Sequence, residues 1–419
     1  MSRLVQKFGG TSVADVGKIG RAAQIAVETA AAGHEVAVVV SAMGHTTDHL
    51  ISLAEQIAPD TSQLNAREMD MLLATGEQVS IALMTMAIQK LGMEARSFTG
   101  AQAGVITENR HGMAKIQEVR ADRLEGSLRR GEIAVVAGFQ GVTESHELTT
   151  LGRGGSDTTA VALAASLGAD RCDIYTDVEG VYTADPRIVQ DARKLASVSY
   201  EEMLELAYTG AQVMNARSVE LAMDNQVAVR VRSTFVPEDP GTLITHKLAS
   251  PEYAIAGIAC DMNSALIRLK SLSTLADMRP LECVSQLFTR LMELAIQTDM
   301  VMVIKHEDEP AQEVTFTVDK AFLTRVNQLI ESLAVPLGNP LMQVETDLAK
   351  ISIVGRRLTS RPELVAMVFN TLNEAEIPVN LVATGDMSVS VLMPARYGRE
   401  AVKLIHERFH LAEGAITFI

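Results

Sequence analysis

The sequence predicts an α/β protein: an N-terminal, mostly parallel sheet between helix layers, followed by two ferredoxin-like domains. Apolar β runs alternate with helical stretches up to about residue 245, the pattern of a parallel sheet covered by helices on both faces. A linker rich in turn residues at 236–241 ends this pattern. Beyond the linker a β-α-β-β-α order occurs twice, and that order is typical of ferredoxin-like domains.

Each element of the first part has a local signal. Buried strands are predicted at 36–40, 133–137, 172–176 and 227–231. Asp15 is expected to cap a helix that ends at Gly33, and Ser199 with Glu202 forms the capping box of a later helix that ends near Gly210. These alternating elements predict βαβ units.

The second part is an internal duplication, because similar residues in 293–301 and 374–382 recur at a spacing of 81 positions. The first copy predicts elements at 265–269, 281–295, 300–304, 313–318 and 321–333; the second predicts them at 350–354, 362–375, 379–383, 387–393, 396–409 and 415–418. We therefore expect three domains, at 1–245, 262–345 and 346–419.

Composition excludes several classes of protein. The net charge of −15 argues against a broad surface for nucleic acid or anionic lipid. Three cysteines without CxxC spacing and histidines without a ligand motif predict neither a disulfide framework nor a structural metal. No uncharged apolar run has the length of a membrane span, and no signal peptide is recognised, so a cytoplasmic protein is expected.

The first glycine motif, KFGGTS, leaves the opening strand at Lys7. Glycines let backbone N–H groups approach a phosphate closely, and a lysine supplies a mobile positive charge. The alternative is a tight turn beside a surface lysine, since the spacing is not that of a Walker loop.

The second glycine motif, residues 149–159 (TTLGRGGSDTT), leads into an apolar helix that ends at Gly168. A helix that begins beside two glycines offers free N–H groups and its positive dipole end to an anion. Arg153 can hold a carboxylate with two hydrogen bonds. Ser156 or Asp157 can instead serve as the N-cap, and the two roles are compatible.

Residues 175–187 (YTDVEGVYTADPR) leave a predicted buried strand for a turn-rich loop. Loops beyond the carboxyl ends of parallel strands are the usual place of a nucleotide in an open α/β sheet. Arg187 can face phosphates and Tyr182 can pack on a base. An ordinary strand-exit loop is the alternative.

Two smaller features complete the candidate residues. Residues 41–48 (SAMGHTTD) follow the strand at 36–40, and Glu77 lies in a predicted helix. A carboxylate such as Glu77 can bind a substrate ammonium, whereas a single Glu more often lies on a solvated helix face. The methionine pairs of 69–71 and 84–86 are interpreted as core packing.

Together these motifs resemble those of the bacterial aspartate kinases of the amino-acid kinase superfamily. The matching stretches are KFGGTS at Lys7, SAMGHTTD at Ser41, REMDMLLATGEQ at Arg67, AGFQGV at Ala137, TTLGRGGSDTTAVALAA at Thr149 and YTDVEGVYTADPR at Tyr175. The duplicated tail resembles the paired ACT domains that bind end-product amino acids in this family. The resemblance implies that a strand at 254–260, before the first ACT domain, joins the second one. The resemblance implies ATP-dependent phosphorylation of the L-aspartate β-carboxylate to 4-phospho-L-aspartate, the entry to lysine, threonine and methionine synthesis, with Mg²⁺ bound mainly through ATP phosphates.

Carried over by position, the resemblance implies three sets of site residues. The catalytic set is Lys7, Arg153 and Asp157, and the aspartate-binding set is Ser41, Thr47, Glu77, Arg153 and Ser156. The nucleotide-binding set is Lys7, Gly9, Gly10, Tyr175, Thr176, Asp177, Tyr182, Thr183, Asp185, Pro186, Arg187 and Gln212. Lys7 would hold the transferred phosphate, and Asp157 would organise Lys7. Arg153 would bind a carboxylate of aspartate, and Glu77 would bind its amino group.

The sequence departs from the family pattern at several positions. Gln212 stands where relatives commonly carry a lysine that reaches the nucleotide, so ATP affinity or rate is expected to be lower unless another cation compensates. In the ACT domains, 271–278 and 361–363 lack the usual Pro-Gly, and 383–386 replaces a Ser-Thr-Ser-Glu-like run. Because a glycine there lets backbone groups cup an effector, we expect weakened or altered feedback by lysine or threonine.

Two alternatives stay open on these residues: an amino-acid sensor whose kinase domain has lost activity, suggested by Gln212, and a kinase for another amino acid. The presence of Lys7, Arg153 and Asp157 favours an active enzyme. The family resemblance further implies a homodimer or a higher even assembly, and the absence of a methionine between Asn225 and Tyr253 favours a single subunit type.

Overall fold

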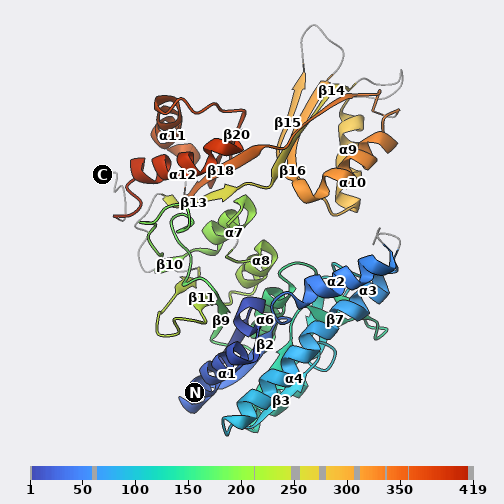
Figure 1. Cartoon of the computed structure of the whole chain (residues 1–419), viewed down its shortest axis with the longest axis vertical. Coiled ribbons are helices and arrows are strands. Elements are labelled where there is room, and N and C mark those ends of the chain that lie inside the picture. The colour runs from blue at the N-terminus through green and yellow to red at the C-terminus, as the bar shows by residue number, and fades with distance from the viewer. Residues whose placement is uncertain are drawn as a thin grey trace. The chain divides into compact units, whose positions relative to one another are not determined.

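The computed structural model describes residues 2–58, 64–211, 213–246, 255–272, 280–305, 312–335, 337–356 and 358–413. The chain forms two compact units (Figure 1). The first contains Met1–Tyr182, Lys194–Tyr208 and Gln212–Pro251; the second contains Thr183–Arg193, Thr209–Ala211 and Glu252–Ile419. The predicted α/β class is confirmed.

An eight-stranded sheet forms the centre of the first unit, in the order β10-β12-β11-β9-β1-β2-β6-β3. Its neighbouring strands are parallel, except for the antiparallel pair β11 and β12. The strands are β1 (Arg3–Phe8), β2 (Glu35–Val40), β3 (Ala95–Phe98), β6 (Ile133–Ala137), β9 (Arg171–Thr176), β10 (Ser197–Val198), β11 (Val229–Ser233) and β12 (Thr242–Ile244). β11 begins two residues later than predicted, because Gln226 adopts a positive φ of 54° and the chain is still turning there.

Helices cover both faces of this sheet. α1 (Val16–Ala31) and α4 (Thr75–Lys90) pack side by side on one face, and α6 (Gly155–Ser166) and α8 (Ala216–Asp224) pack together on the other (Figure 1). The predicted caps are present: the Asp15 side chain accepts the Lys18 N–H at 2.9 Å, and Ser199 and Glu202 exchange side-chain-to-backbone hydrogen bonds. The remaining helices are α2 (Thr46–Ile57), α3 (Ala66–Leu73), α5 (Asp122–Arg129) and α7 (Tyr200–Thr209).

A second, smaller sheet in this unit has the order β5-β4-β7-β8. Its strands are β4 (Val105–Thr107), β5 (Ile116–Val119), β7 (Gln140–Val142) and β8 (Leu148–Thr150). β8 contains the first two residues of the second glycine motif, Thr149 and Thr150, so this sheet determines where the glycine turn of that motif begins.

The expected packing of the methionine pairs is only partly correct. Met84 is fully buried, but Met71 and Met86 are 44% and 62% exposed. The buried stripe of α4 contains Ile81, Met84 and Ile88 at spacings of three and four residues, which leaves Met86 on the opposite side of the helix. On α3 the buried residue is Asp70 rather than a methionine.

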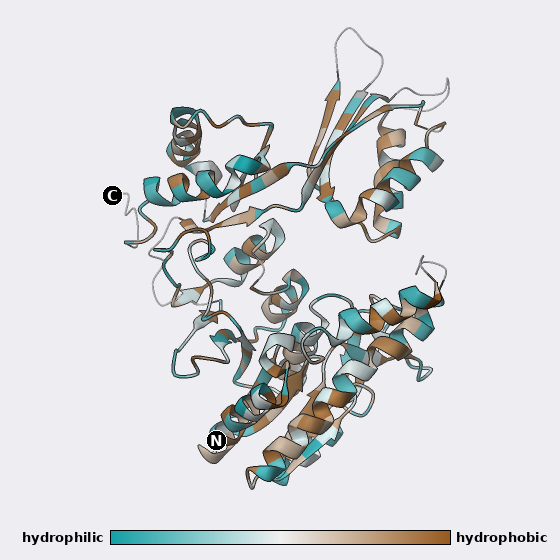
Figure 2. Cartoon of the chain, viewed as in Figure 1, coloured by the Kyte–Doolittle hydropathy of each residue, from teal (hydrophilic) through white to brown (hydrophobic). Residues whose placement is uncertain are grey.

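The stretch Ala66–Lys90 is long and apolar enough to cross a membrane, but a helix that packs in the core of a protein meets the same criterion. It is divided into α3 and α4, and hydrophobic residues recur along α4 (Figure 2). α4 packs against α1, β3 and β6. This apolar stretch therefore contributes to the covering of the sheet.

The second unit contains two four-stranded antiparallel sheets, β15-β16-β14-β17 and β13-β18-β20-β19. The strands are β13 (Ile255–Asp261), β14 (Ser264–Leu272), β15 (Asp299–Lys305), β16 (Gln312–Asp319), β17 (Leu341–Glu345), β18 (Leu348–Gly355), β19 (Leu381–Thr384) and β20 (Ser388–Pro394). β13 precedes the first of these sheets in the chain but pairs with β18 of the second. The predicted strand at 415–418 and most of the loop at 271–278 lie outside the described residues.

Helices complete each copy of the repeat. α9 (Pro280–Glu293) and α10 (Leu323–Ser332) accompany the first sheet, and α11 (Pro362–Glu374) and α12 (Ala395–Arg408) accompany the second. The duplicated β-α-β-β-α order is thus present in both copies. β17 was not predicted, because its residues are mostly exposed and show little apolar alternation.

Candidate active site

Several loops of the first unit leave the carboxyl ends of neighbouring parallel strands, where open α/β sheets bind ligands. Lys7 lies near the end of β1 and is only 8% exposed. Its Nζ lies 2.5 Å from Oδ1 of Asp157, in the first turn of α6. The contact supports the prediction that Asp157 organises Lys7, because a nearby carboxylate fixes an otherwise flexible ammonium.

The two glycines after β1 allow a close approach of the loop after β2. Gly9 donates its N–H to the carbonyl of Tyr175 at 3.1 Å, and Gly44 donates to the carbonyl of Gly10 at 3.0 Å. A Cβ on Gly10 would lie 3.1 Å from the carbonyl oxygen of Ala42. Any side chain at Gly10 would therefore push the two loops apart.

The second glycine motif turns sharply into α6. Gly152 and Gly154 have φ values of 75° and 73°, in the left-handed region that favours glycine. The Arg153 side chain between them is exposed and forms no ion pair with a described residue. Its guanidinium is thus available to an anionic ligand.

Neither Ser156 nor Asp157 is the N-cap of α6, the alternative role that the sequence left open. The N-cap is Gly154, without a side-chain hydrogen bond, and both polar residues lie inside the first turn. Asp157 faces Lys7 instead. Ser156 packs against Gly138, where an added Cβ would lie 2.7 Å from the Ser156 hydroxyl.

Glu77 is a buried acid at the start of α4, only 3% exposed. Its Oε1 accepts the Ala42 N–H at 3.0 Å, whereas its buried Oε2 has no hydrogen-bond partner among the described residues. Burial raises the pKa of Glu77 to about 7. The alternative of a solvated helix face is therefore excluded, and the unpaired oxygen is suited to an ammonium group.

The other predicted aspartate-binding residues lie near these loops. Ser41 is half-buried and donates its N–H to the Phe8 carbonyl at 3.1 Å. Thr47 is half-buried in the first turn of α2. Gly138, which contacts Ser156, donates its N–H to the Val40 carbonyl at 3.0 Å. The ends of β2 and β6 and the start of α6 thus meet in one place.

The predicted nucleotide residues of 175–182 lie in the first unit. The Tyr175 ring is buried, stacks on Phe8 with centroids 4.8 Å apart, and accepts a hydrogen bond from Arg232 at 3.0 Å on its hydroxyl. Thr176 donates to Asp177 at 3.1 Å, and the Tyr182 hydroxyl donates to Glu179 at 3.2 Å. The Tyr175 ring therefore packs in the core of the first unit, and the contact of this residue with the glycine turn is its carbonyl, which accepts the Gly9 N–H.

The predicted nucleotide residues of 183–187 belong to the second unit. The buried Thr183 hydroxyl lies 2.9 Å from Nε2 of His406 on α12. Hydrogen bonds from Arg187, one of them 2.8 Å long, lower the pKa of Asp185. Pro186 lies between these two residues. Gln212 lies outside the described residues, so its role stays a prediction.

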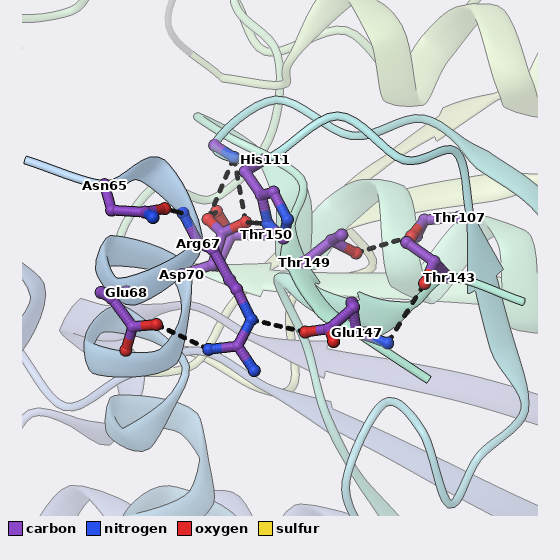
Figure 3. Close-up of polar contacts among 11 residues, drawn as sticks. Asn65, Arg67, Glu68, Asp70, Thr107, His111, Thr143, Glu147, Thr149 and Thr150 are labelled. Carbon is purple, nitrogen blue, oxygen red and sulfur yellow. Dashed lines mark hydrogen bonds and ion pairs between the residues drawn. The ribbon is translucent and has the colours of Figure 1, made fainter. Parts of the chain in front are cut away.

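Sequence reasoning assigned no role to three residues that hold the glycine motif. Asp70 accepts a hydrogen bond from Thr150 (Figure 3). The Asn215 amide donates to the Arg153 carbonyl at 3.2 Å, and Arg217 donates to the Leu151 carbonyl at 2.9 Å. The signal for Asp70 was its place as the only charged residue in the run MDMLLA.

No group of three or more His, Cys, Asp or Glu side chains suited to a metal ion occurs among the described residues. A Mg²⁺ ion that takes most of its ligands from phosphate oxygens and water needs no such group.

Comparisons with known proteins agree along the whole chain. Residues 2–233 match the amino acid kinase family, and residues 351–409 match an ACT domain. Aspartokinase 2 of Bacillus subtilis is 44% identical over 414 residues, covering 99% of both chains. A solved structure of E. coli aspartokinase III with aspartate and ADP has a TM-score of 0.82 at 26% identity, covering 97% of this chain and 99% of that one. The lysine and aspartate complex of that enzyme has a TM-score of 0.74 at 26% identity, with coverage of 96% and 98%.

Proposed function

Since the chain belongs to the amino acid kinase family, and within it to the aspartokinases, we propose that Lys7, Glu77 and Arg153 bind the reacting substrates, ATP and L-aspartate. The observation that carries this proposal is the grouping of a buried cation and a buried acid at one sheet edge. Lys7 is paired with Asp157, and Glu77 has one oxygen without a partner among the described residues.

Aspartate carries two carboxylates and one ammonium, and the site offers a group for each kind of charge. The exposed guanidinium of Arg153 is suited to a carboxylate, and the free oxygen of Glu77 is suited to the ammonium. Ser41, Thr47 and Ser156 supply hydroxyl groups around the same loops. Because the ammonium is a counter-ion, its binding favours the ionised form of Glu77.

The nucleotide binds through Lys7 and the turn at Gly9 and Gly10, with Asp157 holding the lysine. The exit of β9, at Thr176, Asp177 and Tyr182, contributes further contacts to the nucleotide. Thr183, Asp185, Pro186 and Arg187 and the residue Gln212 are proposed for the same role from the family resemblance alone. Mg²⁺, held mainly through ATP phosphate oxygens, supplies additional positive charge to the phosphates when bound.

The chemistry needs no general base, because the β-carboxylate of aspartate is already ionised at neutral pH. A carboxylate oxygen attacks the γ-phosphorus of ATP, and the bond from that phosphorus to the bridging oxygen of ADP breaks. The protein's contribution is to align the two anions and to neutralise charge on the transferred group. Lys7 provides that neutralisation, and Arg153 with Glu77 provides the alignment.

An ATP and hydroxylamine assay tests these roles, because hydroxylamine traps an acyl phosphate as a hydroxamate. Aspartate, glutamate and acetylglutamate are compared for the wild type and for Lys7→Ala. We expect hydroxamate from aspartate alone and its loss in the variant. Trapped product from glutamate at an equal rate would contradict the assignment of the substrate. Undiminished activity of Lys7→Ala would contradict the role of the lysine.

For the second unit we propose binding of an amino-acid effector with weakened or altered feedback. Lysine is bound in the structure of E. coli aspartokinase III. In this chain Pro362 begins α11, and the turn after β19 is closed by the Gly385 N–H donating to Ser388 at 2.8 Å. Titrating lysine and threonine into the assay should give little inhibition at concentrations near the aspartate KM. Strong inhibition at low concentration by either amino acid contradicts the proposal.

We also propose a homodimer or higher even assembly of a single subunit type, and a cytoplasmic location. The paired ACT domains support the assembly, since such domains associate through their sheets and helices in relatives. Light scattering of the purified chain should therefore give twice the monomer mass or an even multiple of it. A monomer at micromolar concentration contradicts the assembly.

A further inference from the structure

A fully buried carboxylate, Asp70, joins α3 to the segment that carries Arg153. Its side chain is 0% exposed. Oδ1 accepts a hydrogen bond from the Thr150 hydroxyl at 2.5 Å, and the Gly112 N–H donates to Oδ1 at 3.0 Å and to Oδ2 at 3.1 Å. Nδ1 of His111 lies 2.8 Å from Oδ2. Figure 3 shows these contacts converging on one side chain. The proposed chemistry uses none of these groups.

The donors to Asp70 flank the start of the glycine motif. Thr150 is the last residue of β8 and directly precedes the turn Leu151–Gly154. The Thr150 carbonyl accepts the Ala114 N–H at 2.9 Å. A Cβ on Gly152 would lie 3.3 Å from the Gly112 carbonyl oxygen. Asp70 therefore holds β8, in which the glycine motif starts, and also the 111–112 turn, against which Gly152 packs.

We propose that Asp70 is a positioning residue for aspartate, acting through Thr150 and the 111–112 turn to place Arg153. This inference rests on the proposed role of Arg153 in binding aspartate. A turn with glycines at 152 and 154 has a large conformational entropy, so a fixed guanidinium needs anchors on both sides. Asn215 and Arg217 hold the far side of the turn, and Asp70 holds the near side.

The chemistry of the contact separates a positioning role from a role of charge. All partners of Asp70 donate hydrogen bonds, and a carboxylate is an acceptor only. In Asp70→Asn, the amide keeps an oxygen for Thr150 and Gly112 when its nitrogen faces His111, whose neutral ring can accept a hydrogen bond. Asp70→Asn should therefore be mild, whereas Asp70→Ala leaves buried donors without partners and should be severe.

The same two segments offer a matched control. Arg67, three residues before Asp70 on α3, pairs with Glu147 beside β8 at 2.6 Å (Figure 3). Both side chains are about two-fifths exposed, and such surface pairs contribute little free energy. Glu147→Gln removes a link between α3 and β8 without touching the end from which the glycine motif starts.

Steady-state kinetics with each substrate varied in turn test the inference, together with thermal unfolding of every variant. Thr150→Val removes one hydroxyl and keeps the shape of the side chain, and Thr150→Ser restores the hydroxyl. We expect Asp70→Ala and Thr150→Val to lower kcat/KM for aspartate by about 10- to 100-fold, with the KM for ATP changed less than about threefold. Asp70→Asn, Thr150→Ser and Glu147→Gln should stay near wild type.

If Asp70→Ala does not fold, the comparison of Thr150→Val with Thr150→Ser still decides the question, because Thr150→Val removes the hydroxyl that Asp70 accepts and Thr150→Ser restores it. The inference is overturned if Asp70→Asn lowers kcat/KM for aspartate as much as Asp70→Ala does. It is also overturned if the variants lower kcat/KM equally for ATP and aspartate, or if Thr150→Val has wild-type kinetics. If Arg153→Ala keeps the wild-type aspartate KM, the proposed role of Arg153 fails, a result separate from these.

Discussion

Glu77 is the residue whose replacement should stabilise the protein while it abolishes tight aspartate binding. In the absence of substrate, its buried carboxyl has one oxygen without a partner among the described residues, and its pKa is raised from 4.5 to about 7. A neutral glutamine at this position keeps an acceptor for the Ala42 N–H. Glu77→Gln therefore removes a buried charge without removing the hydrogen bond that positions the side chain.

The magnitude follows from the pKa. The folded state keeps the Glu77 proton up to about pH 7, whereas the unfolded chain releases it near 4.5. The free energy of unfolding contributed by this group therefore falls as the pH rises between these values, and is constant above them. The full shift corresponds to about 3 kcal/mol, of which about 2 kcal/mol is lost between pH 5 and pH 8. The neutral glutamine contributes no such change.

Urea unfolding of both proteins at pH 5 and pH 8, without substrate, measures this difference. We expect Glu77→Gln to gain about 2 kcal/mol relative to wild type from pH 5 to pH 8, and to raise the aspartate KM at least tenfold because the ammonium loses its counter-ion. Saturating aspartate should stabilise the wild type but not the variant. A pH-independent difference in stability, or an unchanged aspartate KM, would refute the reasoning.

The remaining predictions concern packing and pH. Gly138→Ala places a Cβ 3.0 Å from the Ser156 Cα, so we expect a rise of at least tenfold in the aspartate KM. Gly20→Ala is the control, because a Cβ there meets nothing within 4 Å. It should keep wild-type kinetics and stabilise α1 by about 0.5–1 kcal/mol. Wild-type kinetics in Gly138→Ala would contradict the tight contact. Burial lowers the pKa of His406, so the unfolded chain binds its proton more readily, and stability should fall as the pH drops through about 6.5. His406→Gln should reduce that fall in urea unfolding, whereas the exposed His45→Gln should not; equal pH dependence in all three proteins would exclude His406 as the cause.

The sequence predicted the elements of the fold well wherever a local signal determines them. The caps at Asp15 and Ser199 and the strand 133–137 are present as expected, because hydrophobic period and capping chemistry act over a few residues. β17 escaped prediction because an edge strand with mostly exposed residues has no such pattern. The sequence also could not show that residues 183–193 fold with the second unit, since this depends on Ala184 and Val189 packing into its core.

The candidate site was predictable in its residue types but less so in its contacts. Motifs identified Lys7, Arg153 and Glu77, because glycine turns and isolated charges are visible in a sequence. The burial of Glu77 and the supporting role of Asp70 were not visible, since both depend on loops that are distant in the chain. A charged residue inside an apolar helical run signals burial with partners, and that signal applies to Asp70.

Crossed binding measurements test the central claim most directly, that separate cations hold the two substrates. Isothermal titration of aspartate and of ADP into the wild type, Arg153→Ala and Lys7→Ala compares all four effects under one condition. We predict that Arg153→Ala weakens the binding of aspartate at least tenfold and the binding of ADP less than threefold. We predict the reverse for Lys7→Ala, which should weaken the binding of ADP at least tenfold and the binding of aspartate less than threefold. Arg129→Ala, a surface change on α5, should alter neither. Equal weakening of both ligands by each variant, or unchanged binding in both, would contradict the account.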